Sequence, residues 1–211
     1  MKLYVNDISS ATSRVRIALA IKGISVETLP VTILGENPEN RGADYLRVNP
    51  QGLVPALVTD KGTLVTQSIA IIEYLDELQP NPPLLPAGLE QRALSRAVAL
   101  TIAAEIHALV PPRIARRLSS IPGMDAAGIA DWNRHWTVEG LTAVDSLLAS
   151  HGAGPFVGGE QPSIGDILLF PQMVNAERAG MNLAQWPAAA AIYERLKAVP
   201  AFADNAPAPR K

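Results

Sequence analysis

The sequence predicts two consecutive domains, an α/β domain over residues 1–80 and an all-α domain over residues 89–211. Three observations support this division. Short strand-like and helical segments alternate as far as residue 78. The stretch from Gln79 to Gly88 then carries several prolines and cannot continue a helix. Only helical patterns follow it, so we assign residues 81–88 to a linker.

The first domain is expected to run β-α-β-α-β-β-α. The expected strands are Lys2–Asn6, Val26–Val31, Ala56–Thr59 and Thr63–Thr66, and the expected helices are Arg14–Lys22, Asp44–Val48 and Ile69–Leu78. Gly23 is placed to end the first helix, and residues 60–62 are typical of a hairpin turn. This order is the layout of thioredoxin-like domains, here without a Cys-x-x-Cys pair.

Residues 89–211 read as helices separated by proline and glycine. The expected helices are Glu90–Leu109 with a break at Pro111-Pro112 and a continuation to Leu118, then Ala126–Ser150, Ser163–Ala179 and Pro187–Ala198. Ser163 and Asp166 have the spacing of a capping box at the start of their helix. Residues 206–211 are expected to be a frayed tail.

Composition limits the classes of function. The chain has 211 residues, of which 48% are hydrophobic and 18% charged, as in a globular protein. Its net charge of −2 gives no indication of a nucleic-acid partner. The absence of cysteine excludes disulfides and a protein-thiol nucleophile, and no spacing of His, Asp and Glu predicts a metal site. We expect a cytoplasmic protein without a membrane partner, because there is neither a signal peptide nor a long apolar run.

The segment Asn49–Leu57 runs from a polar turn into an apolar strand. Pro55 cannot donate to a sheet ladder and keeps Val54 extended. Val54 would therefore offer an unpaired backbone edge to a peptide-like ligand. The alternative is an ordinary loop bracketed by prolines. The sequence does not decide whether the Val54–Pro55 bond is cis.

Polar residues stand immediately before two of the expected helices. Ser9 and Ser10 precede the first helix, and Gln67 and Ser68 open the helix that follows the hairpin. The unpaired N–H groups and the positive dipole at a helix start favour an anion there. The alternative is that these serines only cap their helices.

Together these segments resemble the cytosolic glutathione transferases. Residues 9–19 (SSATSRVRIAL) resemble the signature Ser-Ser-Cys-x-x-Arg-Val-Arg-Ile-Ala-Leu of the zeta class, which includes the maleylacetoacetate and maleylpyruvate isomerases. Further matches are residues 49–55, 67–75, 84–86 and 171–178. The resemblance implies the glutathione transferase architecture, glutathione as cofactor, a homodimer, and cis–trans isomerisation of a small dicarboxylic keto acid.

The resemblance also implies roles for individual residues. Ser9, with Ser10 as the second candidate, is expected to activate the glutathione thiol. The residues expected to bind glutathione are Ala11, Asn40, Val54, Pro55, Gln67, Ser68 and His107, and those expected to bind the substrate carboxylates are Arg14, Arg113 and Arg178. His107 can equally be a core residue, and Arg178 a charge that stabilises a helix C-terminus.

Two positions depart from the family pattern. Ala11 stands where the zeta signature has cysteine, so chemistry that needs a protein thiol is lost while activation through Ser9 can survive. Pro111 and Pro112 stand where many bacterial relatives have two asparagines. These departures keep two alternatives open: a conjugating or dehalogenating transferase that acts on another electrophile, and a non-catalytic binding module with the transferase fold.

Overall fold

A computed structural model describes residues 1–152 and 154–209. The chain forms two compact units. The first comprises Met1–Leu84 together with the chain from Val199 onward, and the second is Leu85–Ala198. The first unit contains a four-stranded sheet with helices, and the second contains helices, so the predicted fold class is confirmed.

The sheet has the strand order β2-β1-β3-β4. The strands are β1 (Lys2–Val5), β2 (Glu27–Pro30), β3 (Ala56–Val58) and β4 (Leu64–Thr66), each slightly shorter than predicted. β1 pairs in parallel with β2, and β3 pairs antiparallel with both β1 and β4. Between β3 and β4 the chain turns through Gly62. Its φ is 80°, a conformation that glycine adopts without the steric clash that a side chain would cause.

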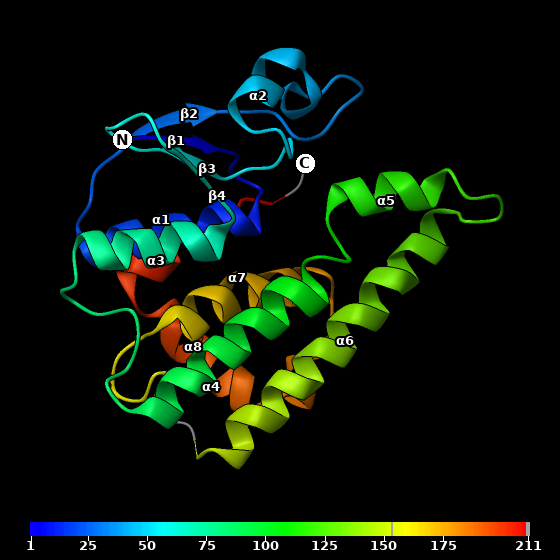
Figure 1. The fold of residues 1–211 in the computed structure, drawn as a ribbon. Helices are drawn as coiled ribbons and strands as arrows, with labels where there is room; N and C mark the ends of the chain where they lie inside the picture. The colour runs from blue at the N-terminus through cyan, green and yellow to red at the C-terminus, as the bar shows by residue number, and fades with distance from the viewer. Residues whose placement is uncertain (153, 210–211) are drawn as a thin grey trace. The chain divides into compact units, whose positions relative to one another are not determined.

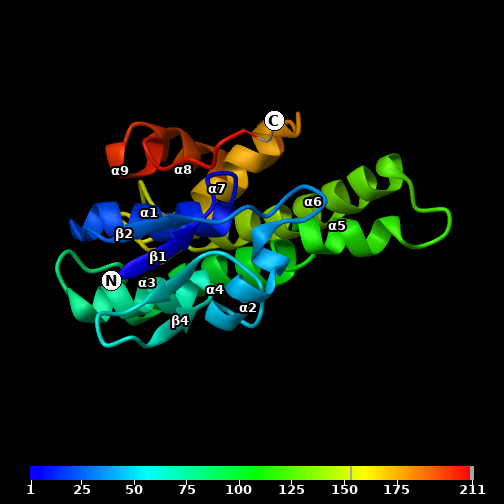
Figure 2. The ribbon, with the colours of Figure 1, turned by 90° about the horizontal axis from the view of Figure 1, so that it is seen from above.

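The helices of the first unit cover both sides of this sheet. α1 (Ser10–Lys22) and α3 (Ser68–Leu78) lie side by side on one face, and α2 (Ala43–Val48) lies on the other (Figures 1 and 2). A short 3₁₀ helix, η1 (Glu39–Arg41), precedes α2. Gly23, at φ 63°, ends α1 as predicted, because its N–H bonds back to the carbonyls of the last turn.

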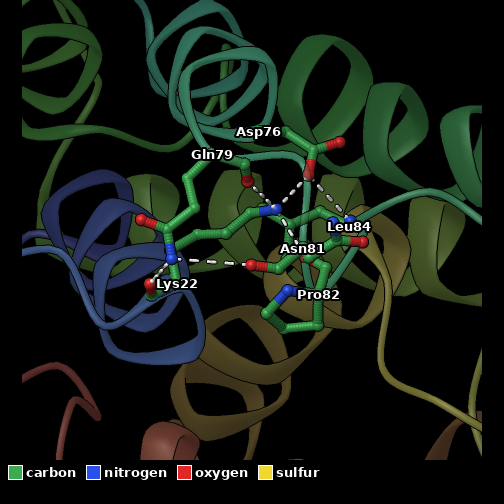
Figure 3. Close-up of polar contacts among 6 residues, drawn as sticks. All are labelled: Lys22, Asp76, Gln79, Asn81, Pro82 and Leu84. Carbon is green, nitrogen blue, oxygen red and sulfur yellow. Dashed lines mark hydrogen bonds and ion pairs between the residues drawn. The ribbon is translucent and has the colours of Figure 1, made fainter.

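Lys22, the last residue of α1, is a buried ammonium with a full set of partners (Figure 3). Its Nζ donates to the Asp76 carboxylate and to the carbonyls of Gln79 and Pro82. Asp76 in turn accepts from the Leu84 N–H at 3.0 Å. All three ammonium donors are therefore used, and the chain that leaves α3 is fastened to the end of α1.

The end of the chain differs from the prediction. α9 (Pro200–Ala203) packs on α1 (Figure 2), and Phe202 is fully buried. The Ala208 N–H donates to the Asp7 carbonyl at 2.7 Å. Residues 199–209 thus belong to the first unit and not to the helical domain, and residues 206–208 are not frayed. The physical reason is that a buried phenylalanine and a backbone hydrogen bond hold this segment. The last two residues of the expected tail lie outside the described residues.

The second unit is built around one central helix. Its elements are α4 (Leu89–Leu100), the π-helix η2 (Thr101–Ile106), α5 (Pro112–Ser119), α6 (Ala126–Ser150), α7 (Ile164–Arg178), η3 (Leu183–Gln185) and α8 (Pro187–Lys197). α7 packs against both α4 and α8 and is buried on nearly every side (Figure 1). Such all-round burial matches its apolar sequence.

The expected helix Glu90–Leu109 is shorter than predicted. α4 ends at Leu100, and the chain widens into η2, where the His107 N–H bonds to the Ile102 carbonyl five residues back at 2.8 Å. Pro112 then begins α5. The first N–H groups of a helix have no partner within the helix, so the missing N–H of proline costs no hydrogen bond at this position. The break at the prolines is confirmed, but a π turn leaves no signature in apolar periodicity and was not predicted.

The capping box at the start of α7 is confirmed and extends to α4. Asp166 is fully buried and accepts from the N–H groups of Ser163 at 2.8 Å and Val157 at 2.9 Å. Ser95 on α4 donates to Ser163 Oγ at 2.8 Å, so the box also ties two helices together. Burial raises the pKa of Asp166 to about 6, against the opposing effect of its hydrogen bonds.

We expect Lys22→Met to lower the free energy of unfolding by about 3 kcal/mol or more, because it leaves the Asp76 carboxylate without its cation. Urea denaturation measures the change. Lys2→Met is the matched control: Lys2 and Glu27 form an exposed ion pair at 3.7 Å, and its loss should change stability by less than about 0.5 kcal/mol. Equal effects of the two substitutions would contradict the role given to Lys22.

The Asp166 carboxyl should make stability depend on pH. Its pKa is raised to about 6, so the folded protein holds this proton to a higher pH than the unfolded chain. The resulting contribution is fully present below about pH 4 and is lost as the pH rises through about 6. Urea denaturation between these values should show a fall in wild-type stability that is smaller in Asp166→Asn. The same pH slope in both proteins would contradict this.

Candidate active site

The strand register brings three separate segments to one edge of the sheet. Tyr4 pairs with Ala56, and Ala56 pairs with Thr66. Because β3 is antiparallel to both neighbours, the chain leaving β1, the chain entering β3 and the chain leaving β4 meet at the same edge. The segments gathered there are residues 6–10, 54–55 and 67–68. They include Ser9, Val54 and Gln67, three of the site residues predicted from the sequence.

Ser9 is the N-cap of α1, and its hydroxyl proton remains available to a ligand. Its Oγ accepts a hydrogen bond from the Thr12 N–H at 3.2 Å. A hydroxyl has one proton in addition to its lone pairs, so acceptance leaves the O–H to donate. Within residues 1–152 and 154–209, no acceptor takes that proton. Ser10 is 4% exposed, whereas Ser9 is half-buried. Ser9 is therefore the more accessible of the two serines to a ligand.

Val54 lies in a bend just before β3. The Val54–Pro55 bond is cis, and the pairing of β3 begins only at Ala56, so Val54 lies outside the ladder. The preceding Leu53 carbonyl accepts from both Tyr45 Oη and Asn49 Nδ2 at 2.7 Å. These two bonds hold in place the loop that precedes Val54.

Asn40 also supports this loop. It is 6% exposed, and its Nδ2 donates to the Gly52 carbonyl at 2.7 Å. Gly52 has φ 61°, and a Cβ there would lie 2.6 Å from the Asn40 carbonyl, so only glycine fits. The predicted contact of Asn40 with glutathione stays a prediction: its Nδ2 is used by Gly52, while its buried Oδ1 has no hydrogen-bond partner within the described residues.

Gln67 and Ser68 form the start of α3. Gln67 has φ 70°, and no other non-glycine residue of the described chain has a positive φ. Its exposed side chain bonds to Gln51 Oε1 at 3.1 Å. α3 has no acidic residue in its first turn and no side-chain bond from its N-cap. The first N–H groups of α3 are thus left for an anion, next to a backbone held in a sparsely populated region.

Arg14 is buried beside the start of α3. It is 1% exposed, inside the first unit, with Nη1 3.5 Å from Ser68 Oγ. Desolvation lowers the pKa of its guanidinium to about 9, which leaves it charged at neutral pH. The predicted contact between Arg14 and a keto acid stays a prediction, because the structure shows its guanidinium buried and hydrogen-bonded to Ser68 only within the described residues.

The other predicted residues are found as follows. Ala11 is half-buried in the first turn of α1 and offers no polar group. His107 is half-buried directly after η2, Arg113 is exposed on the first turn of α5, and Arg178 is the exposed last residue of α7. These three belong to the second unit, and their ligand contacts stay predictions.

Within the described chain, no group of three or more His, Cys, Asp or Glu side chains is arranged to hold a metal ion. None of the helices found in that same part of the chain has the length and apolar character required to cross a membrane.

Sequence reasoning missed three supporting residues: Thr12, Tyr45 and Asn49. Thr12 provides the N–H that Ser9 caps, and the other two hold the Leu53 carbonyl. Asn49 stands beside Pro50 in the polar turn, which was the available signal. The contact of Tyr45 with Leu53 depends on how α2 packs and has no signal in the local sequence.

Comparison with known proteins identifies the family of this chain. The family model for the N-terminal domain of glutathione S-transferase matches residues 8–78. The maleylacetoacetate isomerase of Pseudomonas aeruginosa is 40% identical over 99% of this chain and 96% of its own length. The maleylpyruvate isomerase of a Ralstonia species is 38% identical over 99% and 97%.

Solved structures give the same result. The holo structure of a maleylpyruvate isomerase, described as a bacterial zeta-class glutathione S-transferase, matches with a TM-score of 0.92 and 36% identity over 100% of this chain and 98% of that one. Maleylacetoacetate isomerase from Methylobacterium extorquens, solved with malonate and glutathione, matches with a TM-score of 0.92 and 34% identity over 98% and 96%. This chain therefore belongs to the zeta class of the glutathione transferase family.

Proposed function

We propose that the protein is a glutathione-dependent isomerase that converts a maleyl keto acid, maleylacetoacetate or maleylpyruvate, from the cis to the trans isomer. The observation that carries the proposal is the Ser9 hydroxyl, which caps α1 through its oxygen and keeps its proton for a ligand at the sheet edge. Relatives named for these two isomerisations, at 38–40% identity over nearly the whole chain, support the substrate class.

Residues 1–80 bind glutathione at the sheet edge. The Val54 backbone pairs with the cysteinyl segment of the tripeptide, as in strand addition. The γ-glutamyl carboxylate lies at the start of α3, where Gln67, Ser68 and the first N–H groups provide donors. Both contacts use backbone that the fold leaves unpaired.

The thiol is activated at the start of α1. A free thiol has a pKa of about 8.5 and is mostly protonated at neutral pH. Donation from Ser9 Oγ to the sulfur, together with the positive end of α1, favours the thiolate. The thiolate adds to the cis double bond, the resulting single bond rotates, and elimination returns glutathione unchanged. Ala11 is compatible with this sequence of steps, because no protein thiol takes part.

The helical domain supplies the substrate pocket. Its candidate ligands for the two carboxylates are Arg113 and Arg178, because the planar guanidinium matches a carboxylate with two hydrogen bonds. His107 completes the predicted set. A relative solved with malonate, a small dicarboxylate, together with glutathione supports a dianionic substrate.

One observation favours a second candidate. Pro112 begins α5 and Pro111 caps it, where many bacterial relatives carry two polar amides. A less polar pocket would suit a conjugating or dehalogenating transferase. Turnover with maleylacetoacetate, maleylpyruvate and halogenated acids, each with glutathione, separates the two candidates. Glutathione binding without any turnover would favour the non-catalytic binding module.

We also propose a homodimer in the cytoplasm. Support for the dimer is the family resemblance and the exposed leucines on each unit, Leu78 at 53% on the first and Leu89 at 78% on the second. Sedimentation that shows only a monomer at micromolar concentration would contradict it. The cytoplasmic location follows from the cofactor, because glutathione maintains the reduced thiol pool of that compartment.

We expect Ser9→Ala to lower kcat by about tenfold or more, because the sulfur loses its donor. The variant should also lose about 1 kcal/mol of stability with the cap. Ser9→Gly separates the two effects: glycine is tolerated at an N-cap within a few tenths of a kcal/mol but has no hydroxyl, so it should lose activity with little loss of stability. Titration of the bound thiolate by ultraviolet absorbance should show a higher thiol pKa in both variants. Wild-type activity in Ser9→Gly would rule out Ser9 as the activator.

Arg178→Ala should lower kcat/KM for the keto acid by about 10- to 100-fold, the usual effect of losing a charge-assisted hydrogen bond. The KM for glutathione should stay unchanged. Arg47→Ala is the matched control, because Arg47 is exposed on α2 and forms an exposed ion pair with Asp44. Steady-state kinetics with each substrate varied in turn tests this, and equal losses in both variants would point to net charge alone.

A further inference from the structure

Arg14 is a buried cation without a counter-ion among residues 1–152 and 154–209. Its Nε and Nη2 have no hydrogen-bond partner in the described part of the chain, and its Nη1 makes only the 3.5 Å contact with Ser68 Oγ. Lys22, at the other end of α1, is equally buried but bonded to a carboxylate and two carbonyls. A buried charge that lacks such partners costs several kcal/mol, so its presence calls for a compensating role.

The contact with Ser68 has a defined direction. A guanidinium can only donate, so Ser68 Oγ is the acceptor. The hydroxyl proton of Ser68 therefore points away from Arg14. Ser68 is the first residue of α3, and the first N–H groups of that helix receive no hydrogen bond from a capping side chain. The Ser68 hydroxyl proton and these N–H groups can therefore donate to the same anion.

The charge of Arg14 acts at that position as well. It remains positive at neutral pH, since burial lowers its pKa only to about 9. Water is excluded around it, so its field at the start of α3 is screened less than that of a surface charge. Arg16, two residues further along α1, is different, because it is 30% exposed and paired with Asp7 at 2.8 Å.

We propose that Arg14 is a positioning residue for glutathione, which orients the Ser68 hydroxyl toward the γ-glutamyl carboxylate and supplies the positive charge behind it. The inference rests on the proposed function and extends it, because Arg14 acts through Ser68 without touching the ligand. It also replaces the expected role of Arg14 as a substrate ligand. The consequence is selectivity for thiols that carry a carboxylate at this end.

The test compares two ligands by calorimetric titration. One is glutathione, and the other is γ-aminobutyryl-cysteinylglycine, which lacks only the γ-glutamyl carboxylate. Arg14→Met should weaken glutathione by about tenfold and the analogue by less than about twofold, since a charge-assisted contact is worth about 1.5 kcal/mol or more. In kinetics, the KM for glutathione should rise while kcat at saturation is kept.

Two further variants make the test specific. Arg16→Met removes the same charge from the same helix away from Ser68, and it should leave both affinities unchanged within about twofold. In a Ser68→Ala background, the effect of Arg14→Met on glutathione should shrink, because the two residues act as one unit. An undiminished effect would mean that Arg14 does not act through Ser68.

The outcomes separate this inference from the proposed function. Equal weakening of both ligands by Arg14→Met, or weakening of neither, overturns the role of Arg14 while glutathione binding and isomerase activity stand. No binding of glutathione to the wild type at millimolar concentration overturns both. If Arg14→Met does not fold, Arg14→Lys keeps the charge and should still prefer glutathione over the analogue. Loss of that preference in a folded Arg14→Lys overturns the inference.

Discussion

The site depends on the register of β3, which pairs antiparallel with β1 on one side and β4 on the other. Leu3 and Leu57 are opposite each other in that register, and both are fully buried. A slip of one residue would turn them to the opposite face, so burial fixes the register. The register in turn fixes the edge at which Ser9, Val54 and Gln67 meet, although they are far apart in the chain.

Behind this edge, buried polar groups hold the backbone in place. The Leu53 carbonyl has two side-chain donors and the Gly52 carbonyl has one. Each such bond removes freedom from the loop before Val54, so the unpaired edge is rigid before a ligand arrives. A preformed edge loses less conformational entropy on binding than a mobile loop would, and more of the contact energy becomes affinity.

Sequence reasoning reached the residues that stand next to breaks in the pattern. Ser9 precedes a helix, Ser68 opens one and Val54 precedes a proline, so local chemistry placed each of them at the boundary of an element. The burial of Arg14 and the contact of Asn40 with Gly52 depend on packing between elements distant in the chain. An arginine on a helix predicts a solvated face, and no periodicity reports that its guanidinium lies under a second helix. The same holds for Phe202, whose burial against the first unit turned an expected tail into part of that unit.

The two buried cations of α1, Arg14 and Lys22, have different roles: Lys22 belongs to the fold, and Arg14 is proposed to act in ligand binding. Lys22 is fully bonded within the fold, so the cost of burying its charge is offset without a ligand. Arg14 lacks such partners, so its burial lowers stability until an anion occupies the start of α3. Departures from the usual rules of protein structure are most frequent at functional sites. Arg14, a buried charge without a paired counter-charge in the described chain, is such a departure, and it lies beside the proposed ligand position. An anion that binds only the folded state recovers part of that free energy, which links cofactor binding to the stability of the whole domain.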